Sequence, residues 1–300
     1  MWHSLANSGR SVRRRRLDDV LEIVTLSVTG FFEHNAASMG AALAFYTLFS
    51  VAPILIIAVA IAGYVFGTAT AQSEVLLQLQ ALIGDAGAAA IRELLASAHY
   101  SDKKGFAAAV GIITLVVGAT SVFGELQTAL ERIWQTSPPP KERGWWHLIR
   151  GRVSSIGMVL GVGFLLLVSL VVSAALAAFG GWLGAFVPRL EILLPLVDLS
   201  FSFCMTVLLF ALIYRYIPRE SVPWGDVWVG ATVTALLFTV GKMLIGIYLG
   251  KSSFSSAYGA AGSFIVLLLW IYYSAQIFLL GAEFTRVYAY RQGSRSHRLS

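Results

Sequence analysis

Six long runs of apolar residues divide the chain, and each is long enough to form a membrane-spanning helix. About 20 consecutive apolar residues carry a helix across the hydrocarbon core of a bilayer. The runs cover residues 40–66, 106–127, 154–179, 196–216, 227–249 and 262–282. The sequence lacks the segments of about ten alternating polar and apolar residues that form the strands of outer-membrane barrels. The pattern predicts an all-α, polytopic membrane protein with a bundle of six transmembrane helices.

The composition agrees with a lipid environment. Of the 300 residues, 57% are hydrophobic and 13% are charged, whereas about 25% are charged in ordinary soluble domains. The mean hydropathy is +0.74. The single cysteine, Cys204, excludes an intrachain disulfide and any zinc site built from several cysteines.

The distribution of positive charge predicts the orientation. Lysine and arginine are retained on the cytoplasmic side of membrane proteins. With a cytoplasmic N-terminus, 16 of the 22 basic residues lie on the inner side and 5 on the outer side, and Lys242 lies within a span. The sequence therefore predicts that both termini are cytoplasmic.

The segments outside the spans divide the chain further. Residues 1–39 are predicted to form a basic cytoplasmic tail and an interfacial amphipathic helix, with apolar positions at helical spacing between Leu17 and Phe32. A short helix packed on the bundle, with a disordered basic tail, is an equal alternative. Residues 40–289 form the membrane domain, and 290–300 form a second basic tail. Between the first two spans, Gly67 to Gly105 is predicted to be an external loop with two short amphipathic helices.

Ionisable residues near one end of the predicted bundle form the first candidate site. Within a membrane such residues are costly and often functional. Counted at 1.5 Å per residue, they fall at the cytoplasmic end of their helices. The group consists of Glu125, Glu131, Arg132, Arg215, Glu283 and Arg286. Two interpretations remain open: a structural girdle of paired charges, or a gate for a substrate or ion.

Lys242 lies elsewhere, in the outer third of the fifth span. Asp198, at the outer start of the fourth span, is an acidic residue at a similar height. The sequence suggests a contact between the two side chains or a water-filled outer vestibule that holds both. The alternative is that Lys242 reaches the outer headgroups along its own aliphatic stem.

A kink in the first span gives a third candidate. Pro53 removes a helical hydrogen bond inside this span, so the helix is expected to bend there. Tyr46 and Ser50 lie just before the bend and are candidates for lining a polar path. Hydroxyl groups at such positions also bond to backbone groups freed by the bend, and this structural interpretation stays open.

The sequence carries no recognisable catalytic motif. The five histidines fall in separate segments without metal-ligand spacing, and no phosphate-binding loop or nucleophile elbow is present. We therefore expect no enzyme activity, no metal and no cofactor. The arginine-rich segments adjoin span ends, where anionic headgroups are the expected partners and nucleic acid is not. Envelope proteins are a further class of partner, and the oligomeric state stays open.

Three stretches resemble the YihY/BrkB family of bacterial inner-membrane proteins. They are Ala41-Ala42-Leu43-Ala44-Phe45-Tyr46-Thr47-Leu48-Phe49-Ser50 through Pro53, Leu126-Gln127-Thr128-Ala129-Leu130-Glu131-Arg132-Ile133-Trp134, and Tyr258-Gly259-Ala260-Ala261-Gly262-Ser263 through Leu269-Trp270-Ile271-Tyr272-Tyr273 to Leu280-Gly281-Ala282-Glu283-Phe284-Thr285. The resemblance covers about Leu21 to Tyr290. It implies a six-span inner-membrane protein with both ends in the cytoplasm.

The resemblance implies less about activity. Members of the family have been labelled ribonuclease BN, BrkB-like members are associated with serum resistance, and movement of a lipid or other envelope component has been proposed. No agreed catalytic residues exist to transfer to this chain. Movement of an envelope component is the first expectation, a non-catalytic envelope scaffold is the second, and a membrane-bound ribonuclease is the third.

Overall fold

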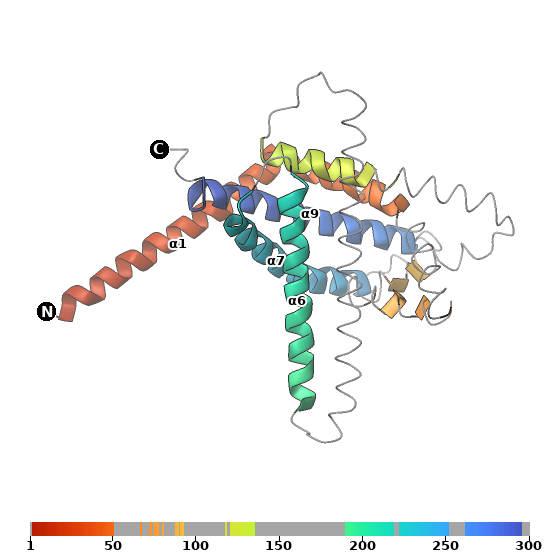
Figure 1. Cartoon of the computed structure of the whole chain (residues 1–300), viewed down its shortest axis with the longest axis horizontal. Helices are drawn as coiled ribbons and strands as arrows, with labels where there is room; N and C mark the ends of the chain where they lie inside the picture. Colours follow the sequence, from red (N-terminus) through yellow and green to blue (C-terminus); the bar gives the residue numbers. More distant parts are fainter. Residues whose placement is uncertain are drawn as a thin grey trace.

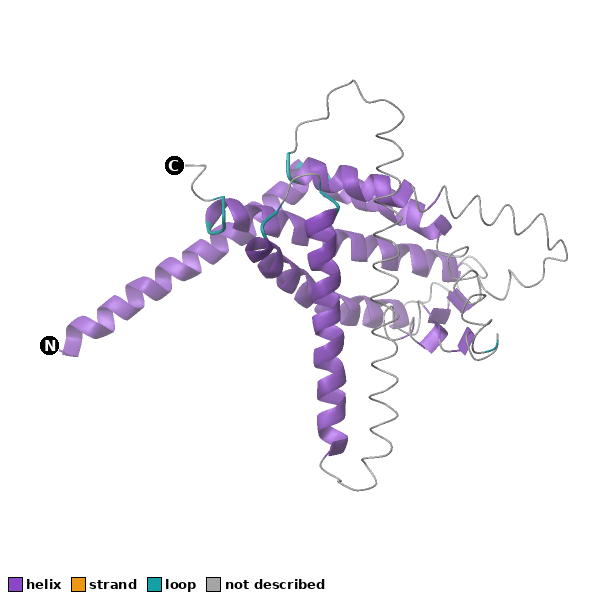
Figure 2. Ribbon diagram, viewed as in Figure 1, coloured by secondary structure: helices purple, strands orange, loops and turns teal. Residues whose placement is uncertain are grey.

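The computed structural model describes residues 2–50, 121–135, 190–218, 222–251 and 262–295, with positions 67, 72–73, 75–77, 80, 88–89, 91–92 and 118. These residues are helical or form short turns, and they contain no strand (Figure 2). The labelled helices are α1 (Trp2–Glu33), α6 (Leu190–Tyr216), α7 (Trp224–Lys251) and α9 (Gly262–Arg291). A helix at Ala36–Ser50 and a helical segment at 121–133 lie between α1 and α6 in the chain (Figure 1).

In the part of the chain that the structure describes, three helices are long and apolar enough to cross a membrane. They contain Leu199–Tyr216, Trp224–Tyr248 and Phe264–Arg291, which match the last three predicted spans. The first predicted span is described only as far as Ser50, and the second only at 118 and 121–127, all of which are helical. The predicted span 154–179 lies outside the described residues.

Helix α1 is longer than the sequence pattern predicts, because it begins at Trp2 and includes the run Arg13–Arg16. Arginine is a good helix former, so the basic run can continue the helix. Its N-terminal part projects away from the other labelled helices (Figure 1). Farther along, Ile23 and Ser27 are buried, and α1 packs against α9.

Two breaks in the helices have clear local causes. After α1, Asn35 adopts a left-handed backbone with φ 56°, a conformation that asparagine tolerates better than most residues. The helix Ala36–Ser50 then begins. Between α6 and α7, Pro218 and Pro223 interrupt the helical hydrogen bonding.

Helices α7 and α9 pack closely because small residues meet threonines. An added Cβ at Gly281 of α9 would collide with Thr234 of α7, and one at Gly230 of α7 would collide with Thr285 of α9. Each threonine hydroxyl donates to the carbonyl four residues before it, Gly230 or Gly281, at 2.7 Å. The two helices therefore interlock in an antiparallel arrangement, with glycine allowing the close approach that helices need in lipid.

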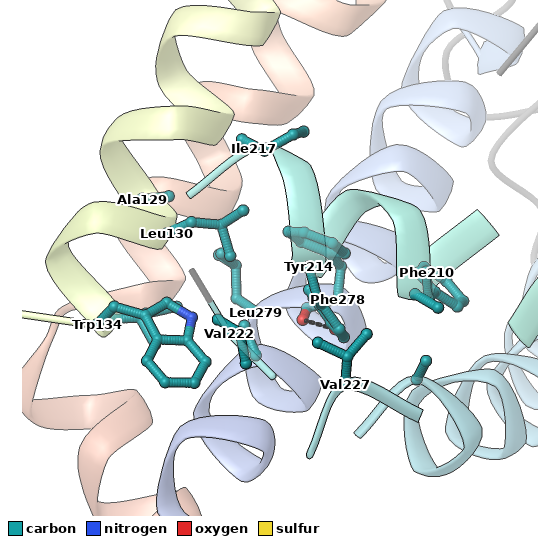
Figure 3. Close-up of a cluster of buried hydrophobic side chains, with 14 of the residues drawn as sticks. Ala129, Leu130, Trp134, Phe210, Tyr214, Ile217, Val222, Val227, Phe278 and Leu279 are labelled. Carbon is teal, nitrogen blue, oxygen red and sulfur yellow. Dashed lines mark hydrogen bonds between the residues drawn. The ribbon is translucent and has the colours of Figure 1, made fainter. Parts of the chain in front are cut away.

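The apolar core connects these helices with the other described segments. Tyr214 of α6 lies against Phe210 and Phe278, and its hydroxyl donates a 2.8 Å hydrogen bond to the Phe278 carbonyl (Figure 3). Leu130 and Trp134, from the segment 121–135, are buried in the same cluster. The core therefore holds α6, α7, α9 and the segment 121–135 together.

A second cluster involves the predicted external loop. Ile91 is buried against Leu48, Leu267 and Ile271. The described positions between 72 and 92 are helical, as predicted for this segment, and the remainder of Gly67 to Gly105 lies outside the described residues.

Candidate functional site

A carboxylate buried among the helices is the centre of the candidate site. Glu283 lies near the C-terminal end of α9, and its side chain has no exposed surface. The backbone of α1 closes over it at Gly30, where an added Cβ would lie 2.8 Å from Glu283 Oε2 and 3.1 Å from the Arg286 guanidinium. Glycine at this position thus lets α1 approach the charged groups directly.

Two side chains hold the Glu283 carboxylate. The Arg286 guanidinium, one turn later on α9, lies 3.1 Å from Oε2. The imidazole of His34, which follows α1, places Nδ1 2.5 Å from Oε1. The His34 and Arg286 side chains are 13% and 18% exposed. The Glu283 carboxylate is therefore covered, and the exposed surface of the cluster belongs to His34 and Arg286.

The ends of two helices meet at the His34 ring. Gln135 places its Nε2 atom 3.3 Å from Nε2 of His34. Gln135 ends its helical segment with a left-handed backbone, φ 51°, as Asn35 does immediately after His34. The ring therefore joins α9 to two points at which the chain leaves a helix.

Among the predicted girdle residues, the structure brings Glu283 and Arg286 together. Arg215 has other partners: its guanidinium donates to the Val222 carbonyl and lies 5.7 Å above the Trp224 ring. These contacts close the turn between α6 and α7. The Glu131 carboxylate accepts a 2.9 Å hydrogen bond from Gln127.

The other predicted site residues occupy separate places. Glu125 is half-buried and Arg132 is exposed on the segment 121–135. Lys242 is half-buried on α7, and Asp198 belongs to α6, but the Asp198 side chain lies outside the described part. A contact between Lys242 and Asp198 therefore stays a prediction.

The predicted polar path is described up to Ser50. The Ser50 hydroxyl is buried and donates a 2.8 Å hydrogen bond to the Tyr46 carbonyl. Hydroxyl groups in membrane helices often bond to backbone carbonyls in this way, and this is the structural interpretation of Ser50. The Tyr46 side chain is exposed, and Pro53 lies outside the described residues.

Sequence reasoning missed three contacts. His34 and Gln135 are 101 positions apart, and His34 and Glu283 are 249 apart, so no local spacing connects them. The third contact joins α7 to the predicted C-terminal tail: the buried Asp226 carboxylate accepts hydrogen bonds from the Ser294 backbone at 3.2 Å and from its hydroxyl at 2.6 Å. Residues 293–295 are therefore packed onto the bundle. Within the described residues, no group of three or more His, Cys, Asp or Glu side chains could hold a metal ion.

Long apolar helices, one of which carries a fully buried carboxylate, define a helical integral membrane protein. The family model described as virulence factor BrkB matches residues 27–299. The chain belongs to the BrkB family, which confirms the resemblance to YihY/BrkB proteins.

The chain is also similar to curated bacterial membrane proteins. A UPF0761 membrane protein of Pseudomonas paraeruginosa is 27% identical over 275 residues, which are 90% of this chain and 63% of the relative. One of Alcanivorax borkumensis is 28% identical over 95% of this chain and 65% of the relative. One of Neisseria meningitidis serogroup B is 28% identical over 90% and 64%. The chain thus spans less than two thirds of the length of these relatives, and no solved structure matches it.

Proposed function

We propose that the chain is a bacterial inner-membrane transporter, flippase-like in action, that moves a lipid or another envelope component. The observation that carries this proposal is the fully buried Glu283 carboxylate within an apolar helix. A buried charge destabilises a helix bundle unless it is paired, and ionisable residues in spans are typical of substrate or ion pathways. We propose no catalytic role for any residue.

The proposed arrangement has six spans and both termini in the cytoplasm. The excess of basic residues on that side supports this orientation and favours contact with anionic headgroups. A polar headgroup crossing the bundle needs a polar route, because unpaired polar groups are costly in hydrocarbon. The cluster of His34, Glu283 and Arg286 would form one gate of that route, with charged groups that can re-pair with a headgroup.

The direct test uses the full chain in vesicles of phosphatidylethanolamine and phosphatidylglycerol. Fluorescent phosphatidylglycerol and phosphatidylethanolamine, bleached from outside by a membrane-impermeant reductant, report movement between leaflets. We expect faster movement than in protein-free vesicles, loss of this gain in Glu283→Gln, and retention in Glu22→Gln. Glu22 is a suitable control because it pairs with Arg291 at 2.8 Å on the surface.

Two results would count against the proposal. If both lipids cross between leaflets no faster than in protein-free vesicles, the protein does not transport them, and the envelope scaffold is favoured. Equal rates of lipid movement in wild type and Glu283→Gln would show that the buried cluster is not part of the pathway.

A further inference from the structure

The two partners of Glu283 respond differently to protons. The Arg286 guanidinium keeps its charge at any biological pH. An imidazole, in contrast, is the side chain whose charge ordinarily changes between pH 5 and 8. Of the groups that contact the carboxylate, His34 is therefore the one suited to gain or lose a proton.

The neighbours of the ring indicate where a proton would bind. The Gln135 amide nitrogen faces His34 Nε2 at 3.3 Å, and an amide nitrogen only donates. The Glu283 carboxylate only accepts, so Nδ1 of the neutral ring carries the hydrogen that points to Oε1, and the Nε2 lone pair faces the Gln135 amide. One further proton from water can bind to the lone pair of Nε2, which converts the ring to imidazolium. Both ring nitrogens then donate, so the Gln135 amide has to present its oxygen in place of its nitrogen, while the contact with Glu283 gains an opposite charge.

The charged groups described near the ring come from three segments. From α9 it faces Glu283 and Arg286, whose charges compensate each other. From α1 the closest approach to this pair is Gly30, which has no side chain, and the neighbouring Glu33 is exposed. From the segment 121–135 the contact is the neutral Gln135, while Glu131 is bound to Gln127.

We propose that His34 and Glu283 form a proton-binding site, and that the proton bound there is the coupling ion of transport. The coupling rests on the function proposed above, whereas the proton site does not. Proton uptake changes the hydrogen bond between His34 and Gln135, which joins the ends of two helices. Gln135 and Asn35, the residue after His34, both have a left-handed backbone there. A change in this hydrogen bond can alter how α1 and the segment 121–135 are held against α9. Such a movement would open the gate proposed at His34, Glu283 and Arg286.

The proton site is tested without any cargo. The full chain is labelled with ¹⁵N-histidine, placed in lipid nanodiscs and titrated by NMR, and His34→Gln identifies the His34 signals by their loss. We expect these signals to change from the neutral to the doubly protonated form as the pH is lowered. Glu283→Gln and Gln135→Leu should each move the midpoint, and Glu22→Gln should not. Gln135 is exposed, so its variant does not disturb the buried carboxylate. A ring that keeps one protonation state throughout, or a midpoint unchanged in both site variants, would overturn the proton site.

Coupling is tested in the same vesicles with an imposed pH difference and fluorescent phosphatidylglycerol. One proton per lipid, driven by one pH unit, can support about a tenfold asymmetry of lipid between leaflets. We expect an asymmetry approaching this value in wild type and in Glu22→Gln, and none in His34→Gln. Movement in wild type that ignores the pH difference would overturn coupling and leave transport in place. Absence of movement in wild type would overturn transport, and coupling with it, and the NMR titration would still decide the proton site.

Discussion

Nδ1 of His34 lies 2.5 Å from Oε1 of Glu283, across the interface of α9 with the end of α1. The carboxylate is fully buried, so its partners determine whether the charge is tolerated. Removing one partner of a buried pair leaves the other without compensation, which is more damaging than losing an exposed pair.

We therefore expect Glu283→Ala to lower the free energy of unfolding by about 3 kcal/mol. Glu22→Ala, which breaks the exposed pair with Arg291, should lower it by less than about 1 kcal/mol. Reversible denaturant unfolding in bicelles measures both values. Similar small losses in the two variants would mean that the buried cluster does not stabilise the bundle.

The interlocked glycines of α7 and α9 give a second prediction. A Cβ at Gly281 would meet Thr234 and would lie 2.7 Å from the Tyr214 hydroxyl, whereas a Cβ at Gly246 meets nothing within 4 Å in the described structure. Gly281→Ala should destabilise the protein by about 1–3 kcal/mol, as overpacking does. Gly246→Ala is the matched control on α7 and should not destabilise it. The same unfolding assay compares them, and equal stabilities would contradict the close packing.

Features that depend on neighbouring residues in the chain are predictable from this sequence, whereas contacts between distant residues are not. The last three spans follow from runs of apolar residues, which is a local property, and Glu283 was selected because a charge in such a run is costly. Its main partner from another segment, His34, lies 249 positions away, and pairing over that distance depends on how the helices pack. Depth alone groups Arg215 with the other charges, yet its guanidinium bonds to the Val222 carbonyl in the turn after α6. The sequence predicts that Ser294 lies in a tail, because nothing in the local sequence indicates its bond to Asp226.

The contact between Asp226 and Ser294 gives a third prediction. Losing the carboxylate removes the acceptor of the hydrogen bonds that hold residues 293–295 against α7. Each such bond to a charged group is worth about 1.5–3 kcal/mol, so Asp226→Ala should expose Arg295 and make tryptic cleavage after it about tenfold faster or more. Asp19→Ala, at an exposed position of α1, is the control. Unchanged cleavage in Asp226→Ala would show that other contacts of Arg295, such as that with Trp134, suffice.

The proposed orientation gives a fourth prediction. Green fluorescent protein fused after Ser300 should fluoresce in a bacterial cell, because it folds in the cytoplasm. Alkaline phosphatase inserted in the segment Gly67 to Gly105 should be active, because it needs the oxidising outer side. Loss of both signals would reverse the topology. One signal without the other would place the segment and the C-terminus on the same side, which requires a different number of spans.

Thiol labelling tests the central claim, that a water-accessible path opens through the buried site, most directly. The exposed Cys204 is first replaced with alanine. Single cysteines are then placed at Ser27, 3% exposed on the α1 face that packs on α9, and at Ser50, 2% exposed, with the exposed Thr25 as the control on α1. We predict that a membrane-impermeant reagent labels Ser27→Cys and Ser50→Cys, at a rate that changes with pH. Labelling of Thr25→Cys alone, with both buried positions protected at every pH, would contradict a transport path and describe a closed, dry bundle.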